Sequence, residues 1–283
     1  MFFNLIYTIF FTYYYLKLQK KSIVFLCRKK IDSISLAGCG FLALYLIGAL
    51  KCLDHHRPSL FKKVLFAGAS AGALLSACCV CKVPIDYAKV KFLSAAADAK
   101  TRPFGPFNPK FDVEKYLYRS MEFLPVDAHI KASGRLFVSL TRLEDFKNVM
   151  VSHWDTREEL IQTLLCSCFI PVFSGFNAPT FRGVKYIDGG YTNKQPIISN
   201  NTLTISPFSG EAIICPRNPI SSQSKKEKTR KRVLIWGRYK MDLSLENLGR
   251  MYSSVMPPKP LNLVEYENLG YKDAYRFIQS KRS

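Results

Sequence analysis

The 283-residue chain has few acidic residues and few histidines. It carries 21 Asp and Glu against 41 Lys and Arg, a formal net charge of +20, and only four histidines. This excess of positive charge indicates an acidic partner surface. The chain lacks zinc-finger spacing, an aromatic RNA-binding signature and a helix-turn-helix pattern. We therefore expect no nucleic-acid partner and favour an anionic membrane or lipid-droplet surface.

The sequence also lacks a metal-binding pattern among its nine cysteines, which are scattered through mostly apolar runs. Cys78, Cys79 and Cys81 have no second ligand pair at suitable spacing, so we interpret them as small buried residues of a helix. This cysteine usage is typical of a reducing compartment. A hydrophobic content of 48% with 22% charged residues excludes general disorder, and the length suits one large α/β domain.

The N-terminal segment has no charged residue before Lys17. Residues 1–16 are rich in Phe, Tyr and Ile, and a helix of that length would span about 24 Å, short of the ~30 Å hydrocarbon core. A secretory signal is disfavoured because the basic residues follow the apolar stretch and no small-residue cleavage site comes after it. We interpret residues 1–31 either as a minimal or interfacial anchor, with the body on the cytoplasmic side, or as an error of gene prediction.

Two segments in succession read as strand, glycine turn and helix, over residues 32–53 and 64–81. Their apolar strands must be buried on both faces. The predicted fold class is therefore α/β, with a mainly parallel central sheet and helices on both faces. The runs 34–50 and 64–81 resemble membrane spans in hydropathy, but their central glycine turns argue against spanning.

Ser70 lies in the second of these turns, between Gly68 and Gly72. The pattern Gly-x-Ser-x-Gly between a strand and a helix is that of a nucleophile elbow. The glycines permit a tight turn, and the N-terminus of the following helix offers N–H groups and a positive dipole where negative charge would develop. Taken alone, the motif fits a small-residue turn equally well.

Asp188 follows the predicted strand 184–187 and precedes Gly189 and Gly190, so a carboxylate would enter a glycine turn at the end of the sheet. By itself this Asp would be a turn former, but beside Ser70 it predicts the base of a nucleophilic serine. None of the four histidines lies in an elbow or a strand-end turn, which disfavours a histidine base. The predicted oxyanion donors are the backbone N–H groups of Gly38, Cys39, Gly40 and Phe41.

In this order, the glycine loop, the elbow and the Asp-Gly-Gly turn resemble the patatin-like phospholipase family, in particular the branch of adipose triglyceride lipase and adiponutrin. Further segments at 132–142, 165–171, 206–210 and 243–248 are similar, so the resemblance covers about residues 32–280. It implies a serine lipid acyl hydrolase with a Ser-Asp dyad and no cofactor or metal. Triacylglycerol at a lipid-droplet or membrane surface is the substrate that the resemblance favours. Ser70 would attack the acyl carbonyl, Asp188 would accept its proton, and water would resolve the acyl-enzyme.

Alternatives within this resemblance are a phospholipase, a retinyl ester hydrolase and an acyltransferase, because pocket walls select the substrate. A lipid-surface binding protein of low turnover is a further alternative, and a protein co-activator is a further candidate partner. Gly38 to Ala43 also matches the dinucleotide fingerprint G-x-G-x-x-A of an oxidoreductase. The acidic residue required about twenty positions later would be Asp54, which we place at a helix end and not at the end of a second strand.

Two positions depart from the family pattern. Ala43 stands where a third glycine is common, and we expect a modest effect because alanine is small. Lys194 stands where an asparagine usually lies two residues before the proline, here Pro196, and we expect it to alter the rim of the site.

The remaining organisation divides the chain into an N-terminal segment, a catalytic domain over 32–216, a basic linker over 217–233 and a C-terminal helical extension over 234–283. Residues 101–109 are predicted to be a loop. Thr156 and Glu159 have capping-box spacing and predict a helix start, and further helices are predicted over 244–255 and 271–279. The basic run 225–232 is interpreted as a membrane-contacting segment, a solvated linker or a nuclear-import-like patch. The predicted membrane contacts are Lys225, Lys226, Arg230 and Lys231.

Overall fold

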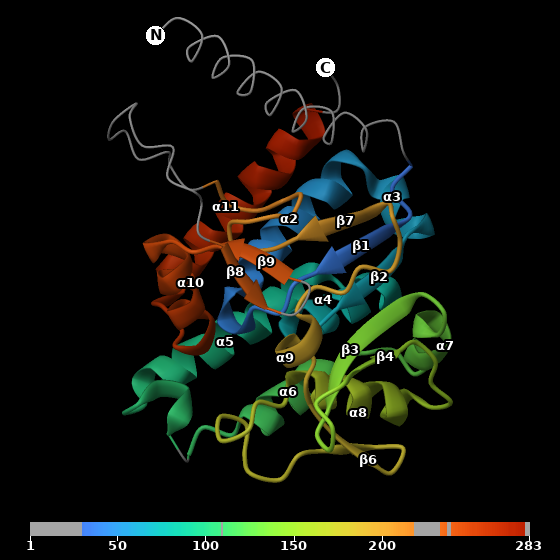
Figure 1. The fold of residues 1–283 in the computed structure, drawn as a ribbon, viewed down its shortest axis with the longest axis vertical. Coiled ribbons are helices and arrows are strands. Elements are labelled where there is room, and N and C mark those ends of the chain that lie inside the picture. Colours follow the sequence, from blue (N-terminus) through green and yellow to red (C-terminus); the bar gives the residue numbers. More distant parts are fainter. Residues whose placement is uncertain (1–29, 109, 218–232, 237–238, 281–283) are drawn as a thin grey trace, which may run out of the picture.

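The structure is a computed structural model that describes residues 30–108, 110–217, 233–236 and 239–280 (Figure 1). Residues 1–29 of the predicted anchor lie outside the described residues, as do the four predicted membrane contacts of the basic run. These two expectations stay predictions.

A seven-stranded sheet forms the centre of the molecule. Strands β3, β2, β1 and β7 lie side by side and are parallel. Strands β4 and β6 pair with β3 in antiparallel orientation, and β5 pairs antiparallel with β6 at the edge. The α/β class and the mainly parallel sheet are thus confirmed, and the antiparallel edge is a feature that we did not predict. The strands are β1 (Ser33–Leu36), β2 (Leu65–Gly68), β3 (Leu136–Arg142), β4 (Asn148–Val151), β5 (Thr180–Phe181), β6 (Val184–Asp188) and β7 (Thr202–Ile205).

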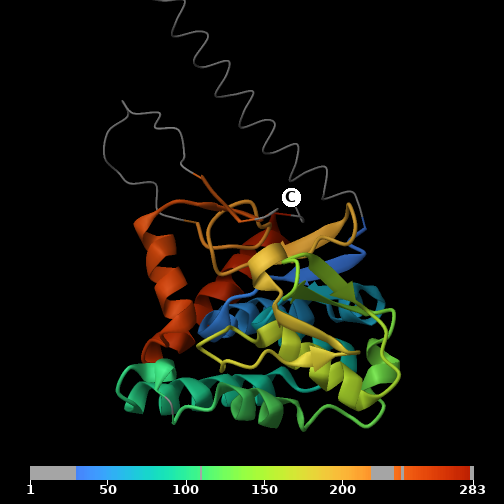
Figure 2. The same cartoon turned by 60° about the horizontal axis from the view of Figure 1, so that its bottom comes forward.

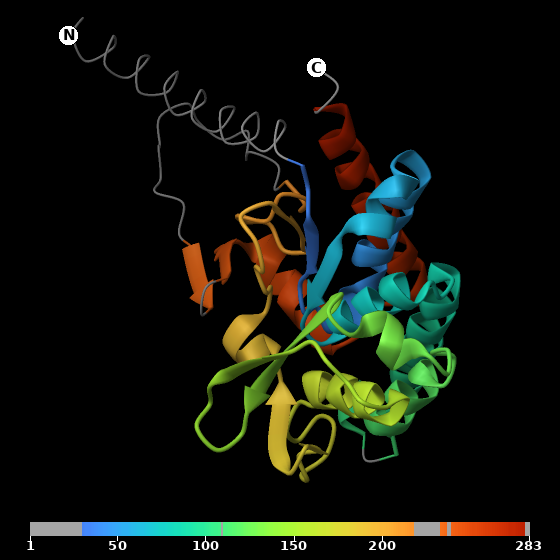
Figure 3. The same cartoon turned by 90° about the vertical axis from the view of Figure 1, so that its right-hand side faces the viewer.

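Helices cover the sheet unequally on its two sides. In Figure 3, α2, α4 and α11 lie on one side of β1 and β2, while the short α9 and the separate antiparallel pair of β8 and β9 lie on the other. Both faces of the sheet are therefore covered. The remaining elements are η1 (Gly40–Leu42), α2 (Ala43–His56), α3 (Pro58–Lys63), α4 (Ala71–Cys81), α5 (Ile85–Thr101), η2 (Gly105–Phe107), α6 (Val113–Met121), α7 (Ala128–Ala132), α8 (Arg157–Cys168), α9 (Gly190–Asn193), β8 (Val233–Trp236), β9 (Tyr239–Asp242), α10 (Leu245–Val255) and α11 (Pro260–Gln279).

The two predicted strand-turn-helix units are confirmed as β1–η1–α2 and β2–α4. β1 and β2 are parallel neighbours, and the last pair in their register joins Leu36 to Gly68. Because parallel strands end at the same edge, the glycine loop after β1 and the elbow after β2 emerge next to each other. Among the described residues, no helix combines the length and the hydropathy needed to cross a bilayer.

The C-terminal helix α11 packs closely on α2. A Cβ built on Gly48 would lie 1.9 Å from Glu267 O, and one built on Gly270 would lie 2.0 Å from Tyr45 O, so these glycines permit backbone-to-backbone contact. The predicted helix over 271–279 is correctly placed but far too short, because α11 has 20 residues. The division at 217–233 stays a prediction.

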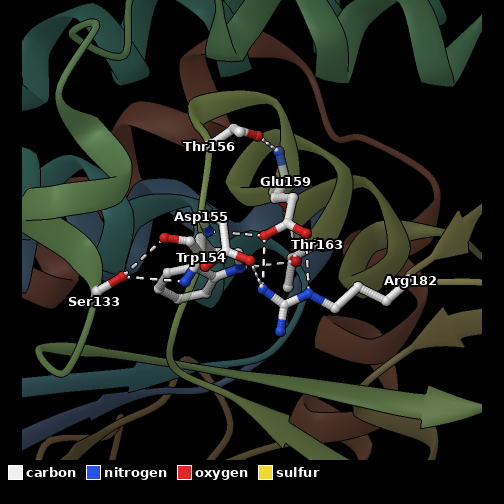
Figure 4. Close-up of polar contacts among 7 residues, drawn as sticks. All are labelled: Ser133, Trp154, Asp155, Thr156, Glu159, Thr163 and Arg182. Carbon is white, nitrogen blue, oxygen red and sulfur yellow. Dashed lines mark hydrogen bonds and ion pairs between the residues drawn. The ribbon is translucent and has the colours of Figure 1, made fainter.

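Helix α8 begins as the capping box predicts (Figure 4). Thr156 Oγ1 accepts a hydrogen bond from Glu159 N at 3.1 Å, and the Glu159 carboxylate accepts one from Asp155 N at 2.8 Å. Arg182 adds a bidentate contact to Glu159, but at 47% side-chain exposure such a pair contributes little. The cap matters because the opposite end of α8 reaches the site described below.

We expect Gly48→Ala to lower the free energy of unfolding by about 1–3 kcal/mol or more, because the new methyl group would force α2 and α11 apart. The matched control is Gly249→Ala in α10, where a Cβ would meet nothing within 4 Å. This control should stabilise the protein by up to about 1 kcal/mol through helix propensity. Urea denaturation of both variants measures the difference, and equal effects would contradict the close helix contact.

Candidate active site

Ser70 occupies a strained turn between β2 and α4. Its φ of +53° and ψ of −132° lie in a region that residues with a side chain rarely adopt. The strained peptide is held from the end of α8, where Ser167 Oγ accepts a hydrogen bond from Ser70 N at 2.9 Å. The Ser167 hydroxyl donates in turn to Ser139 O in β3, also at 2.9 Å. The elbow is thus fixed by a chain of hydrogen bonds that runs to the central sheet.

The two glycines of the elbow are required by close packing. A Cβ on Gly68 would lie 2.5 Å from Gly72 C, and a Cβ on Gly72 would lie 2.3 Å from Leu36 O at the end of β1. Any side chain at either position would therefore push α4 away from the strands. The two glycines of the Gly-x-Ser-x-Gly pattern are therefore needed for the close contact of α4 with the strands as well as for the turn.

Asp188 ends β6, and its carboxylate lies near Ser70. The side chain of Ser70 is close enough to the Asp188 carboxylate to lower its pKa. Gly190 N donates to Asp188 Oδ1 at 2.6 Å, and Asp188 N donates to Phe169 O at 2.7 Å. Burial raises the pKa of Asp188 to about 6, while the Ser70 side chain, the hydrogen bond from Gly190 and the positive charge of Lys194 oppose that rise.

Gly189 and Gly190 allow the turn after β6 to close on β3. A Cβ on Gly189 would lie 1.9 Å from Ser139 O, and a Cβ on Gly190 would lie 2.9 Å from Asp188 Oδ1. Ser139 O therefore contacts both the Asp-Gly-Gly turn, at Gly189, and the hydroxyl of Ser167, which supports the elbow.

The glycine loop after β1 lies against Ser70. A Cβ on Gly38 would be 3.4 Å from Ser70 Cβ, and a Cβ on Gly40, which has a φ of +50°, would be 2.0 Å from Ser254 O. Gly38 N already donates to Lys194 O at 2.9 Å, so its N–H group is occupied in this structure. Gly40 and Phe41 open the η1 turn, and N–H groups at the start of a helical turn have no partner within it.

Cys39, within the same loop, is buried at 3% exposure. Burial raises the pKa of its thiol to about 12, so the side chain remains neutral.

A cavity opens over Ser70 and contains about 740 Å³ of empty space, including the part that is open to solvent. Gly40 and Phe41 line it together with Ser70, and α5, α6, the end of α10 and the segment after α8 form most of the remaining wall. This wall is mainly apolar and suits a long hydrophobic group. Its principal apolar residues are Phe92, Ala95, Phe111, Val113, Leu117 and Phe173.

Lys194 is half-buried and lies beside the glycine loop and Phe208. Its Nζ is 3.9 Å from the centroid of the Phe208 ring, a cation–π contact. Burial lowers the pKa of Lys194 to about 8, against the opposing influence of Cys39 and Asp188. Through its carbonyl and its charge, this residue acts on both the glycine loop and the carboxylate.

The four histidines, all of them within the described residues, lie away from the cavity wall. His55 and His56 end α2, His129 is in α7, and His153 contacts Ser152. No trio of His, Cys, Asp or Glu side chains in the described part of the chain is placed to hold a metal ion.

The dinucleotide alternative lacks its acidic residue. Asp54 lies within α2, and the second strand begins only at Leu65. The glycine loop is therefore not followed by the strand-end carboxylate that would bind a ribose.

Sequence reasoning missed α5 and α6, which form much of the cavity wall. The spacing of Val113, Tyr116, Leu117 and Ser120 fits one helical face and could have identified α6. Sequence reasoning also missed the role of Ser167. This residue lies 97 positions from Ser70, and nothing local indicates that its hydroxyl would reach the elbow.

We expect Ser167→Ala to lower the free energy of unfolding by about 1–3 kcal/mol, because the buried Ser70 N–H would lose its acceptor. Ser76→Ala is the matched control, since this equally buried serine of α4 makes a 3.2 Å bond to Ala67 O in β2 and none to the elbow residues 68–72. Ser76→Ala should lower the free energy of unfolding by less than Ser167→Ala does. Urea denaturation measures both, and a larger loss for Ser76→Ala would contradict the support role of Ser167.

Comparison with known proteins agrees with this geometry. The sequence profile of the patatin-like phospholipase family matches residues 34–201, which include the glycine loop, the elbow and Asp188. The chain is 41% identical over 256 residues to patatin-like phospholipase domain-containing protein 2 of Homo sapiens, covering 89% of this chain and 49% of that protein.

Two further human relatives are named for acyl transfer. A 1-acylglycerol-3-phosphate O-acyltransferase is 37% identical over 253 residues, or 88% of this chain and 51% of that protein. An omega-hydroxyceramide transacylase is 38% identical over 259 residues, or 87% of this chain and 46% of that protein. The chain spans about half the length of the curated relatives it matches. On the strength of the matched profile and the site that lies within it, the chain belongs to the patatin-like phospholipase family.

Proposed function

We propose that this chain is a serine lipid acyl hydrolase in which Ser70 is the nucleophile and Asp188 its base. The observation that carries the proposal is that the end of α8 holds both residues beside an apolar cavity: Ser167 Oγ accepts a hydrogen bond from Ser70 N, and Phe169 O accepts one from Asp188 N. A strained serine at a helix N-terminus, a buried carboxylate and a loop of amides together supply what acyl transfer requires.

In the proposed reaction, Ser70 Oγ attacks the acyl carbonyl as its proton passes to Asp188. Protonated Asp188 then gives this proton to the departing alcohol, which leaves an acyl-enzyme on Ser70. Water attacks the acyl-enzyme while Asp188 accepts its proton, the bond between the acyl carbon and Ser70 Oγ breaks as Asp188 returns that proton to Ser70 Oγ, and the carboxylic acid leaves. Because burial raises the pKa of Asp188 to about 6, the carboxylate is mostly ionised at neutral pH and is still a stronger base than an exposed Asp.

The oxyanion would be held by backbone amides at the cavity wall. We assign Gly40 and Phe41 as donors because both line the cavity and open the η1 turn, with Cys39 N–H as a further candidate. Ala71 follows the nucleophile, lines the cavity and opens α4, so its amide and the helix dipole favour the same charge. The bound amide of Gly38 instead anchors the loop to Lys194.

The proposed substrate is a neutral acylglycerol that is presented by a lipid droplet or membrane on the cytoplasmic side. Triacylglycerol is the acylglycerol that we favour. The apolar wall supports a long acyl chain, and the relatives support lipid esters as a class. Contacts of Lys225, Lys226, Arg230 and Lys231 with an anionic surface, and a protein co-activator, remain predictions.

Acyl transfer is a second candidate function. Two relatives carry the names of an O-acyltransferase and a transacylase. An alcohol that replaces water at the acyl-enzyme stage would give this outcome with the same residues. Product analysis with and without an added alcohol acceptor distinguishes the two functions.

Ser70→Ala should lower ester hydrolysis by about 10³-fold or more, because the acyl-enzyme cannot form. Ser76→Ala should retain activity. A fluorophosphonate should label the wild type, with the modified residue mapped to Ser70 by mass spectrometry. Equal hydrolysis by wild type and Ser70→Ala would end the hydrolase proposal.

The pH profile of kcat/KM for a soluble short-chain ester should rise as pH increases through about 6, because Asp188 must be ionised to accept a proton. Lys194→Met removes a positive charge that lowers the pKa of Asp188, so the rise should move to higher pH. Lys185→Met, at an exposed position of β6, is the control and should leave the profile in place. A shift to lower pH in Lys194→Met would contradict the role given to this charge.

A further inference from the structure

Apolar side chains are exposed on two loops beside the cavity over Ser70. After α5, Phe104 is 81% exposed and Phe107 is 48% exposed; after α8, Val172 is 65% exposed and Phe176 is 86% exposed. We call the segments 102–108 and 170–176 the rim loops. They touch each other, because the rings of Phe107 and Phe173 pack edge to face with centroids 5.5 Å apart, and Phe173 lines the cavity.

The backbone of the rim loops is strained at two of these exposed residues. Phe104 has a φ of +62° and Val172 a φ of +71°, and the second value is especially unfavourable for a β-branched side chain. A glycine or asparagine would adopt either conformation more easily and would not expose an apolar surface to water. Strained backbone at exposed apolar residues therefore indicates that these side chains bind a surface other than the protein itself.

Helix α10 also exposes apolar residues beside the cavity. Leu245, Leu248 and Tyr252 are spaced along one helical face and are 83%, 48% and 68% exposed, and we call them the α10 stripe. Asn247 is buried instead and bonds to both Ser209 N and Ser209 O. This arrangement reverses the usual one, in which a surface helix buries its apolar face. The end of the helix reaches the cavity, where Val255 lines the wall.

Basic side chains accompany these apolar residues. Lys100 and Lys110 are exposed on either side of Phe104 and Phe107, and Lys115 is exposed on α6. Arg102 is already paired with Asp98 through a 2.8 Å contact. Exposed lysines next to apolar side chains match a surface with negative headgroups above an acyl interior.

We propose that the rim loops and the α10 stripe dock onto an anionic phospholipid surface, so that the cavity opens directly against it. Phe104 and Phe176 project singly from loops, and insertion among fluid acyl chains requires no complementary shape. A folded protein partner would instead need a matching contour. The inference rests on the proposed function only in the choice of a lipid surface, and its tests are independent of catalysis.

The first test places a tryptophan in a rim loop. Phe176→Trp protein is mixed with vesicles of phosphatidylcholine and phosphatidylserine that contain brominated acyl chains, which quench tryptophan only within the bilayer. Ile130→Trp in α7 is the control, because Ile130 is 69% exposed and α7 lies at the opposite edge of the molecule from α10 in Figures 1 and 2. Quenching beyond that of wild type is expected for Phe176→Trp alone. No added quenching there, or equal quenching in both variants, would overturn the proposal.

The second test measures the vesicle partition coefficient of Ser70→Ala protein, so that no lipid is consumed. Two double variants are made in this background, and each should lower the partition coefficient roughly tenfold or more. One combines Phe104→Ser with Phe176→Ser, and the other combines Leu248→Ser with Tyr252→Ser. Val126→Ser, at a residue that is 86% exposed between α6 and α7, should not lower the coefficient. Unchanged partition in either double variant would overturn the proposal as stated.

The same double variants with Ser70 intact should hydrolyse a soluble short-chain ester at the wild-type rate, because none of the four positions lines the cavity. Loss of that activity together with vesicle binding would indicate misfolding and would overturn the assignment of a docking role. A wild type that binds vesicles but hydrolyses no ester would refute the proposed function and leave the docking surface standing.

Discussion

The hydrogen bond from Ser70 N to Ser167 Oγ is the interaction on which the site depends. It holds a serine at a φ of +53°, a conformation that the chain would otherwise avoid. Ser167 is itself fixed by Ser139 O in β3, and the next turn of the chain accepts Asp188 N at Phe169 O. The end of α8 therefore positions both residues of the proposed dyad, and the polar cap at its other end keeps the helix in place.

Close packing at the edge of the sheet explains the glycines of the motifs. Gly72 lies against the end of β1, and Gly189 lies against Ser139 in β3, each at a distance that excludes a Cβ. Gly40 has the same relation to Ser254 at the end of α10. These contacts hold three loops against one another. The glycines that define the motifs are therefore required first for close packing of the backbone.

The electrostatics of the site follow from the same burial. Asp188 is taken out of water, which raises its pKa to about 6, and Ser70, Gly190 and Lys194 limit that rise. Lys194 stands where the family usually has asparagine, and it adds a cation close to the carboxylate. The neighbouring cavity is mainly apolar, so charges that develop at Ser70 would meet backbone amides more often than water.

The local sequence determined the paired strand-turn-helix units, the start of α8 and the family to which the chain belongs. Each of these depends on spacing or turn chemistry within about twenty residues, as at Gly68, Ser70 and Gly72 or at Thr156 and Glu159. The pairing of Ser70 with Asp188 was predicted from the elbow and the Asp-Gly-Gly turn together with the family resemblance, and it stays a prediction. Tertiary structure alone decided the antiparallel edge strands, the full length of α11, the reach of Ser167 and the occupied amide of Gly38. These features arise from contacts between residues far apart in the chain, whose geometry is set when the helices and strands pack together and not by any local pattern.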